Sequence, residues 1–185
     1  MPTPCPNPDG SSPKMRRFDE PPPMCIDPSM RYSAEMVTSM GTMRIALDAA
    51  SAPLTVNNFV FLSRYHYYEG VVFHRVIPGF VLQGGDPTGT GTGGPGYRFA
   101  DELPKAGRYE LGSLAMANAG PDTNGSQFFI ISGPDGMRLP PQYSLFGKVV
   151  SGMDVVAAID RLGSRSGKPE RLVNIESVTI TETGD

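Results

Sequence analysis

From about residue 36 onward, short apolar stretches alternate with turns rich in Gly and Pro, and this pattern limits what the chain can fold into. Gly and Pro are unfavourable inside helices and strands, so such frequent turns favour many short strands. MVTSMGTMRIALD predicts a strand, a Gly turn and a second strand, because Met43, Ile45 and Leu47 alternate toward one face. RLVNIESVTITE, residues 171–182, predicts a closing strand.

Two segments have the periodicity of helices instead. SAPLTVNNFVFLSRY, residues 51–65, predicts a helix that Ser51 caps and that has Pro53 in its first turn. A second helix is predicted at about residues 152–162, where apolar side chains gather on one side. Many short strands with two helices indicate a mainly β protein, in which a closed sheet is capped by the helices.

The first 33 residues differ in composition from the rest of the chain. Nine of the 19 prolines fall within residues 1–28, and PPP occupies residues 21–23. Proline disfavours helix, so we predict an extended N-terminal arm over residues 1–33, followed by one domain over residues 34–185. The arm has few apolar residues, so we expect it to add little to the core and to be dispensable. A linker and a proline-motif ligand for another domain are both open interpretations of it.

The only cysteines, Cys5 and Cys25, both lie in this arm. Two free thiols in a reducing compartment are the expectation, which favours a cytoplasmic protein. The alternative is one disulfide in an oxidising compartment, hence an extracytoplasmic protein that has lost an upstream signal or anchor. Two cysteines lack the further ligands that a closed zinc site needs, so no metal site is expected.

The composition excludes several classes of partner. The formal net charge is −3, so no strongly basic face is implied and nucleic acid is not expected as a partner. No apolar run reaches the length of a membrane span. GTGTGG, residues 89–94, matches a dinucleotide-binding pattern, but Pro95 and Gly96 follow where a helix would have to begin. We therefore interpret it as a loop and expect no cofactor.

Three segments carry an ordered set of motifs. FHRVIPGFVLQGGD occupies residues 73–86, MANAGPDTNGSQFFI residues 116–130 and RLPPQYSLFGKV residues 138–149, with GSRSGK at residues 163–168. Together they resemble the cyclophilin family of peptidyl-prolyl cis–trans isomerases, over about residues 36–182. The short YHYYEG connection is similar to the bacterial single-domain branch. The resemblance implies a closed eight-stranded antiparallel β-barrel capped by two helices, which isomerises X-Pro bonds (EC 5.2.1.8) and assists protein folding as a chaperone.

The resemblance also implies the roles of particular residues. Arg75 would be the catalytic residue, donating hydrogen bonds toward the amide as it twists, and Gln83 would hold the substrate backbone and orient the arginine. The remaining substrate-binding residues implied are Phe80, Val81, Phe129 and Leu139 for the proline ring, and Ala117, Asn118, Gln127 and Tyr143 around it. No metal or cofactor is implied.

The implied partners are proline-containing peptides and unfolded proteins, bound by a monomer. Arg138 stands where well-known family members have tryptophan, so cyclosporin-type ligands are expected to bind only weakly. Two other functions remain open. One is a proline-peptide binding module with little turnover, which would not need Arg75. The other is a structural barrel whose partner binds through the arm.

Overall fold

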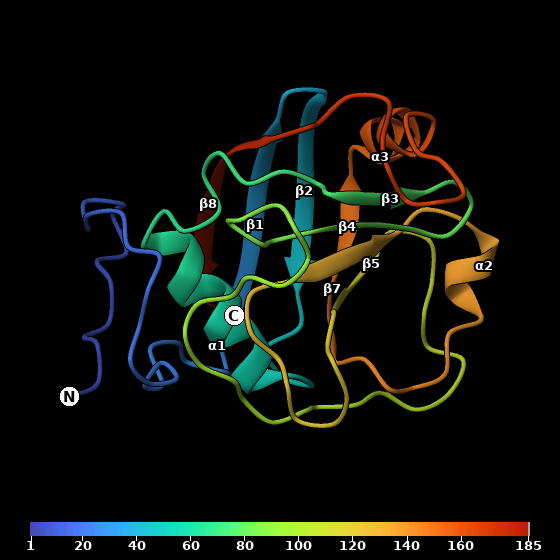
Figure 1. The fold of residues 1–185 in the computed structure, drawn as a ribbon. Coiled ribbons are helices and arrows are strands. Elements are labelled where there is room, and N and C mark those ends of the chain that lie inside the picture. The colour runs from blue at the N-terminus through green and yellow to red at the C-terminus, as the bar shows by residue number, and fades with distance from the viewer. Residues whose placement is uncertain (185) are drawn as a thin grey trace.

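The computed structural model describes residues 1–184 and is mainly β (Figure 1). Its strands are β1 (Arg31–Thr38), β2 (Gly41–Leu47), β3 (Arg75–Ile77), β4 (Val81–Gly84), β5 (Ser113–Met116), β6 (Phe128–Ile131), β7 (Leu145–Ser151) and β8 (Ile175–Thr183). Its helices are α1 (Pro53–Arg64), α2 (Pro134–Met137) and α3 (Met153–Asp160). All strand pairs are antiparallel, so the predicted eight-stranded antiparallel sheet is confirmed.

The sheet is an open half-barrel, and the prediction of a closed barrel was wrong. The strand order is β3-β4-β6-β5-β7-β2-β1-β8, and no ladder joins β3 to β8 in the described part of the chain. The two ends meet at one bridge between Val72 and Asn174, with hydrogen bonds from Gly70 N to Ile175 O (2.7 Å), from Phe73 N to Val173 O (3.0 Å) and from Ile175 N to Val71 O (2.8 Å). β3 has only three residues and begins after the bridging residue Val72, so no long ladder joins the two ends.

The two predicted helices are present as α1 and α3, but a third was missed. α2 is a single turn of four residues, too short to show a helical period in the sequence. The predicted cap of α1 was also wrong, because its N-cap residue is Ala52 and makes no side-chain cap. Glu102 takes that role: its carboxylate accepts hydrogen bonds from Leu54 N (3.1 Å) and Thr55 N (2.7 Å). A negative charge at a helix N-terminus is favourable, and it comes from a loop distant in sequence.

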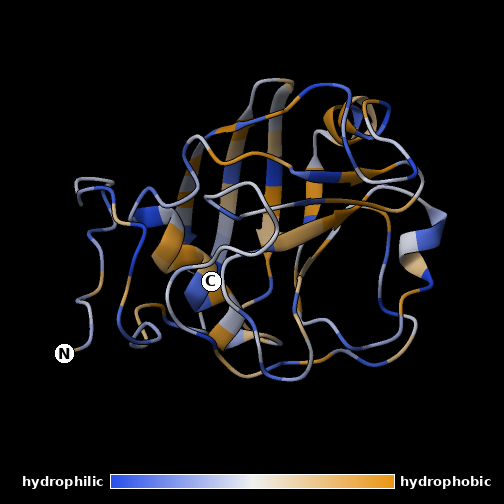
Figure 2. Ribbon diagram, in the orientation of Figure 1, coloured by the Kyte–Doolittle hydropathy of each residue, from blue (hydrophilic) through white to orange (hydrophobic). Residues whose placement is uncertain are grey.

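Side-chain alternation divides the sheet into a face toward the main core and a face toward a smaller apolar cluster. Leu82 of β4 and Ile130 of β6 lie in the main core, which α1 and α3 cover. Their neighbours Val81 and Phe129 belong to the small cluster instead. Figure 2 shows hydrophobic residues along the strands and in α1 and α3. Successive side chains of a strand face opposite sides, so the same short strands build both the core and an apolar surface pocket.

The N-terminal arm has no helix or strand over residues 1–30, as predicted, yet it packs against the domain. Phe18 is 4% exposed and Ile26 is 7% exposed, and both belong to the main core. The ring of Phe18 lies 5.1 Å from that of Phe61 and 5.6 Å from that of Tyr65, measured between centroids. The expectation that the arm adds little to the core was therefore wrong, because a few large apolar side chains are enough to dock it.

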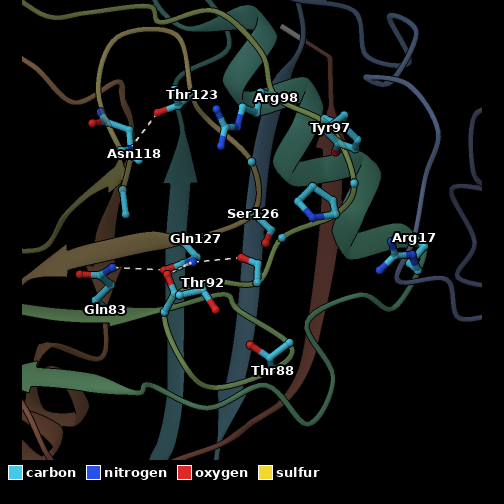
Figure 3. Close-up of a pocket in the computed structure, with 18 residues that line it drawn as sticks. Arg17, Gln83, Thr88, Thr92, Tyr97, Arg98, Asn118, Thr123, Ser126 and Gln127 are labelled. Carbon is cyan, nitrogen blue, oxygen red and sulfur yellow. Dashed lines mark hydrogen bonds between the residues drawn. The ribbon is translucent and has the colours of Figure 1, made fainter.

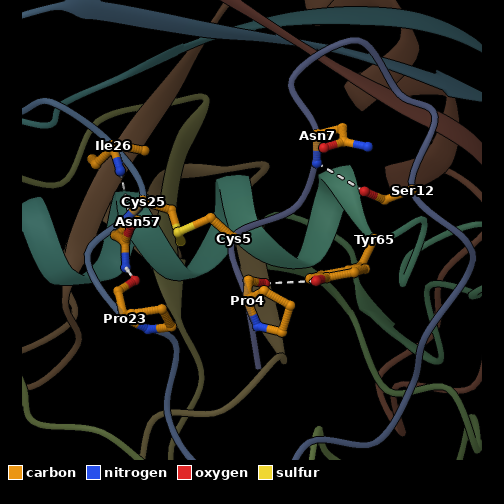
Figure 4. The surroundings of a disulfide bond; sticks show 9 residues. All are labelled: Pro4, Cys5, Asn7, Ser12, Pro23, Cys25, Ile26, Asn57 and Tyr65. Atoms are coloured by element: carbon orange, nitrogen blue, oxygen red, sulfur yellow. Dashed lines mark hydrogen bonds between the residues drawn. A yellow bond between two sulfur atoms is a disulfide. The ribbon is translucent and has the colours of Figure 1, made fainter. Parts of the chain in front are cut away.

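A disulfide between Cys5 and Cys25 closes this docked arm, so the expectation of free thiols was wrong (Figure 4). Helix α1 holds the segment next to the disulfide. Asn57 accepts hydrogen bonds from Cys25 N (2.8 Å) and Ile26 N (3.2 Å), and its amide donates to Pro23 O (2.9 Å). A side chain in the predicted helix thus satisfies backbone groups of the arm and brings the second cysteine to its place.

Candidate active site

Arg75 and Gln83 face each other across the hairpin of β3 and β4. The pair is in register, and Arg75 Nη1 donates a hydrogen bond to Gln83 Oε1 at 3.2 Å. The stem of Arg75 lies against Gly167, where an added Cβ would come within 2.9 Å of the arginine Cγ. Gly167 has φ of +90°, so a side chain there would be strained as well. The guanidinium is thereby held at the surface with a defined direction.

A chain of amide hydrogen bonds continues from Gln83 into the 86–94 loop. Gln83 Nε2 donates to Gln127 Oε1 at 3.3 Å. Gln127 Nε2 in turn donates to Gly91 O (2.8 Å) and Gly93 O (3.0 Å) (Figure 3). The orientation of Arg75 therefore depends on a loop that begins three residues after Gln83.

The fully buried carboxylate of Asp86 organises this loop. It accepts hydrogen bonds from Thr88 N (2.8 Å), Gly91 N (2.7 Å) and Gly93 N (3.1 Å). The predicted loop over residues 89–94 is confirmed, since no helix begins there. Backbone amides that could have bound phosphate are occupied by the chain's own carboxylate, which argues against a nucleotide site.

Lowering the pH to about 2 is expected to remove the stabilisation that Asp86 provides. Burial alone would raise the pKa of Asp86, but hydrogen bonds from Thr88, Gly93 and Gly91 outweigh it and hold the pKa at about 2, against an ordinary value of 3.8. The folded-state pKa is the lower one, so the contribution is present above about pH 4 and is lost as the pH falls toward about 2. It amounts to about 2 kcal/mol.

The measurement is the free energy of urea unfolding for the wild type and for Asp86→Asn at a series of pH values. The advantage of the wild type should shrink by about 2 kcal/mol between roughly pH 5 and pH 2. A difference between the two proteins that does not change with pH would contradict this role of the carboxylate.

A pocket of about 400 Å³, lined by both apolar and polar side chains, opens beside Arg75. The predicted site residues that line it are Arg75, Phe80, Val81, Gln83, Ala117, Asn118, Phe129, Leu139 and Tyr143. Gln127 lies in the adjoining wall and reaches the pocket through Gln83. The structure therefore brings all ten predicted residues together. His74, Thr90 and Gly91 also line the pocket and were not predicted, although the Gly-rich motif pointed to a loop at this position.

The aromatic wall of the pocket is fixed from behind. The rings of Phe129 and Tyr143 meet edge to face, with centroids 5.4 Å apart. Tyr109 is buried, and its hydroxyl donates to Tyr143 O (2.7 Å) and accepts from Tyr143 N (3.2 Å). Asn118 Nδ2 donates to Gln142 O (2.9 Å). Tyr109 was missed because nothing in the sequence connects it to a segment 34 residues further on.

His74 does not supply a second cation beside Arg75. Burial lowers the pKa of its imidazole, and the charge of Arg75 lowers it further, whereas Asp86 acts in the opposite direction. The imidazole is therefore neutral at neutral pH.

Among residues 1–184 no group of three or more His, Cys, Asp and Glu side chains is arranged to hold a metal ion. No helix in the same range is long and apolar enough to cross a membrane.

Comparisons with known proteins identify the family to which this chain is similar. Residues 33–180 match the family described as "Cyclophilin type peptidyl-prolyl cis-trans isomerase/CLD". The chain is 44% identical over 157 residues to peptidyl-prolyl cis-trans isomerase-like 2 of Cryptococcus neoformans, covering 80% of this chain but only 27% of that relative's length. It is 44% identical over 173 residues to peptidyl-prolyl cis-trans isomerase A of Mycobacterium tuberculosis, covering 83% of this chain and 94% of the relative.

A solved structure agrees as well. The crystal structure of a Cryptosporidium parvum cyclophilin type peptidyl-prolyl cis-trans isomerase, in the presence of the dipeptide Ala-Pro, superposes with a TM-score of 0.74. It is 36% identical and covers 80% of this chain and 98% of that one. The chain therefore belongs to the cyclophilin-type peptidyl-prolyl cis–trans isomerase family. Assignment to the bacterial branch stays a prediction, since fungal as well as mycobacterial proteins are among its relatives.

Proposed function

We propose that this protein isomerises X-Pro bonds in peptides and unfolded proteins. The observation that carries the proposal is one guanidinium, held by Gln83, beside a pocket that is large enough for a proline ring and includes Phe80, Phe129 and Leu139 in its lining. The Ala-Pro dipeptide in the related crystal structure is consistent with this class of substrate. A role in protein folding follows from the same chemistry, because X-Pro isomerisation takes tens to hundreds of seconds without catalysis.

To accelerate this reaction, a protein must stabilise the twisted state of the X-Pro amide. Rotation about the peptide bond has a barrier of roughly 18–20 kcal/mol because twisting destroys the amide resonance. In the twisted state the proline nitrogen regains a lone pair that can accept a hydrogen bond. Arg75 has five N–H donors and stays protonated, so it can donate toward the twisted amide without a proton transfer. A donor that binds the twisted amide better than the planar one accelerates the reaction.

The pocket supplies the other requirement, which is to hold the proline ring while its amide turns. Phe80, Phe129 and Leu139 provide an apolar surface for the ring. Gln83 is placed between the guanidinium and Gln127, so it can contact the substrate backbone without releasing the arginine. The bound ring then stays fixed while the residue before it rotates.

Turnover measured in a coupled assay on an Ala-Pro peptide tests the proposal. The specificity constant kcat/KM should be nearly constant between about pH 5.5 and 8.5, because arginine does not titrate there and the proposed step uses no general acid or base. A bell-shaped profile would require a general acid or base and would contradict the mechanism. Peptide binding without turnover would instead identify a binding module.

We also propose that the protein binds cyclosporin-type ligands only weakly. A separate proposal is that it is a monomer. Arg138 is exposed at the end of α2 and is not part of the pocket lining, so it offers a solvated charge where an aromatic side chain would add apolar area. Titration calorimetry with Arg138→Trp as the comparison tests the ligand, and sedimentation equilibrium tests the monomer. Equal affinities, or a dimer at micromolar concentration, would refute the respective proposal.

The compartment in which the protein acts and the division of the chain into an arm and a domain are further proposals. The Cys5–Cys25 disulfide favours the extracytoplasmic alternative over the cytoplasm, because disulfides persist in oxidising compartments. Alkylation of thiols in intact cells should leave both cysteines unmodified, and alkylated cysteines would contradict the proposal. We retain an arm and an isomerase domain as the two parts of the chain. β1 begins at Arg31, so the arm ends close to residue 30.

A further inference from the structure

A second cavity, of about 900 Å³, adjoins the proline pocket (Figure 3). The two cavities have four lining residues in common: Gln83, Gly91, Ala117 and Asn118. A polypeptide held by its proline in the smaller pocket therefore passes next to the larger cavity. Side chains close to the proline in the client sequence can enter it.

This cavity has a basic lining. Arg17 and Arg98 both contribute to its wall, and none of the residues that line it is Asp or Glu. Within residues 1–184 neither guanidinium has a hydrogen-bond or ion-pair partner in the protein, and both residues are exposed. Arg16, the neighbour of Arg17, instead donates to Glu69 O at 2.6 Å. The cavity thus has two free cations on a chain whose net charge is −3.

The arm is anchored at the point where it supplies Arg17. Phe18 N donates to Pro95 O at 2.8 Å, and the Phe18 ring is buried in the main core. Gly96 lies so close that an added Cβ would be 2.5 Å from Phe18 O. The arm and the loop that leads to Arg98 are therefore packed together, and Figure 3 shows Arg17 and Arg98 on either side of Tyr97.

We propose that Arg17 and Arg98 select client segments that carry Asp or Glu within a few residues of the target proline. A guanidinium binds a carboxylate through charge-assisted and often bidentate hydrogen bonds, whereas a neutral side chain of similar size gains neither. Arg17 lies outside residues 33–180, which match the family, so the arm adds this selectivity to the family domain. The proposal rests on the proposed isomerase function.

The test uses the full chain and pairs of Ala-Pro peptides that differ by Glu or Gln at each of the three positions on either side of the dipeptide. For the best position, kcat/KM of the Glu peptide should exceed that of its Gln partner by about twofold to fivefold at low salt, the range of an exposed ion pair. The ratio should fall toward one in the double variant Arg17→Gln/Arg98→Gln, and also in the wild type at about 1 M salt.

Arg161→Gln is the matched control, because Arg161 is an exposed arginine at the end of α3 and lines neither cavity. It should keep the wild-type ratio. A ratio of one in the wild type at low salt, or an undiminished ratio in the double variant, would overturn the proposal. If no peptide were turned over, the isomerase function would be wrong instead. The affinities of the same peptide pairs, measured by fluorescence anisotropy, would then decide the charge selectivity in the same way.

Discussion

Replacing Arg75 by alanine should lower kcat/KM for an Ala-Pro peptide by about 100-fold or more, which corresponds to roughly 2.7 kcal/mol of transition-state stabilisation. The reason is that Arg75 is the only cation at neutral pH among the described residues that line the proline pocket, since burial lowers the pKa of His74. Peptide affinity should fall much less, because the apolar walls that bind the proline ring remain. The measurement is a coupled assay of turnover, together with calorimetry of peptide binding.

Two controls separate loss of chemistry from loss of structure. Arg75 is exposed, so the alanine variant should unfold at nearly the wild-type denaturant concentration. Arg75→Lys keeps the charge but not the planar fork that meets Gln83, so its turnover should lie between those of the wild type and Arg75→Ala. Turnover close to that of the wild type in folded Arg75→Ala would show that the guanidinium is not the catalytic donor.

Replacing Phe18 by alanine should lower the free energy of unfolding by about 3–5 kcal/mol, the usual loss for a buried Phe. This ring fills a space between Phe61, Tyr65 and Tyr97, and its removal leaves a cavity under the arm. The arm is also tied down by the disulfide, so it cannot simply move away to fill that space. Urea unfolding followed by circular dichroism measures the change.

Met24→Ala is the control within the same arm, because Met24 is 50% exposed. Its effect should stay within about 0.5 kcal/mol, as is usual for surface substitutions. If Phe18→Ala also left stability unchanged, the arm would not be docked in solution. The arm would then be dispensable, as its composition suggests.

The sequence predicted the candidate site better than the fold around it. The resemblance to the cyclophilin family grouped the ten site residues, and the structure places nine of them around one pocket and Gln127 in the adjoining wall. Gln127 does not line the proline pocket itself, but it accepts a hydrogen bond from Gln83, which does. Tyr109 shapes the same site from behind, and its role depends on a segment 34 residues further on that only the folded structure brings next to it.

Three of the errors in the fold, those on the arm, the cysteines and the cap of α1, have a common physical cause. Composition indicated that the arm is rich in proline, but the docking of Phe18 depends on a cavity formed by other parts of the chain. The pairing of Cys5 with Cys25 depends in the same way on Asn57 of α1. The cap of α1 comes from Glu102, 47 residues beyond Thr55. Each is a long-range contact, and none has a local sequence signal.

The most direct test of the central claim is the rate of cis–trans exchange of an Ala-Pro peptide, measured by NMR exchange spectroscopy with catalytic amounts of the full chain. Exchange without protein takes tens to hundreds of seconds, so the cis and trans signals then show no exchange on the NMR mixing time. The account predicts strong exchange cross-peaks with the wild type and their near absence with Arg75→Ala at the same peptide occupancy. Binding of the peptide to the wild type without faster exchange would contradict it.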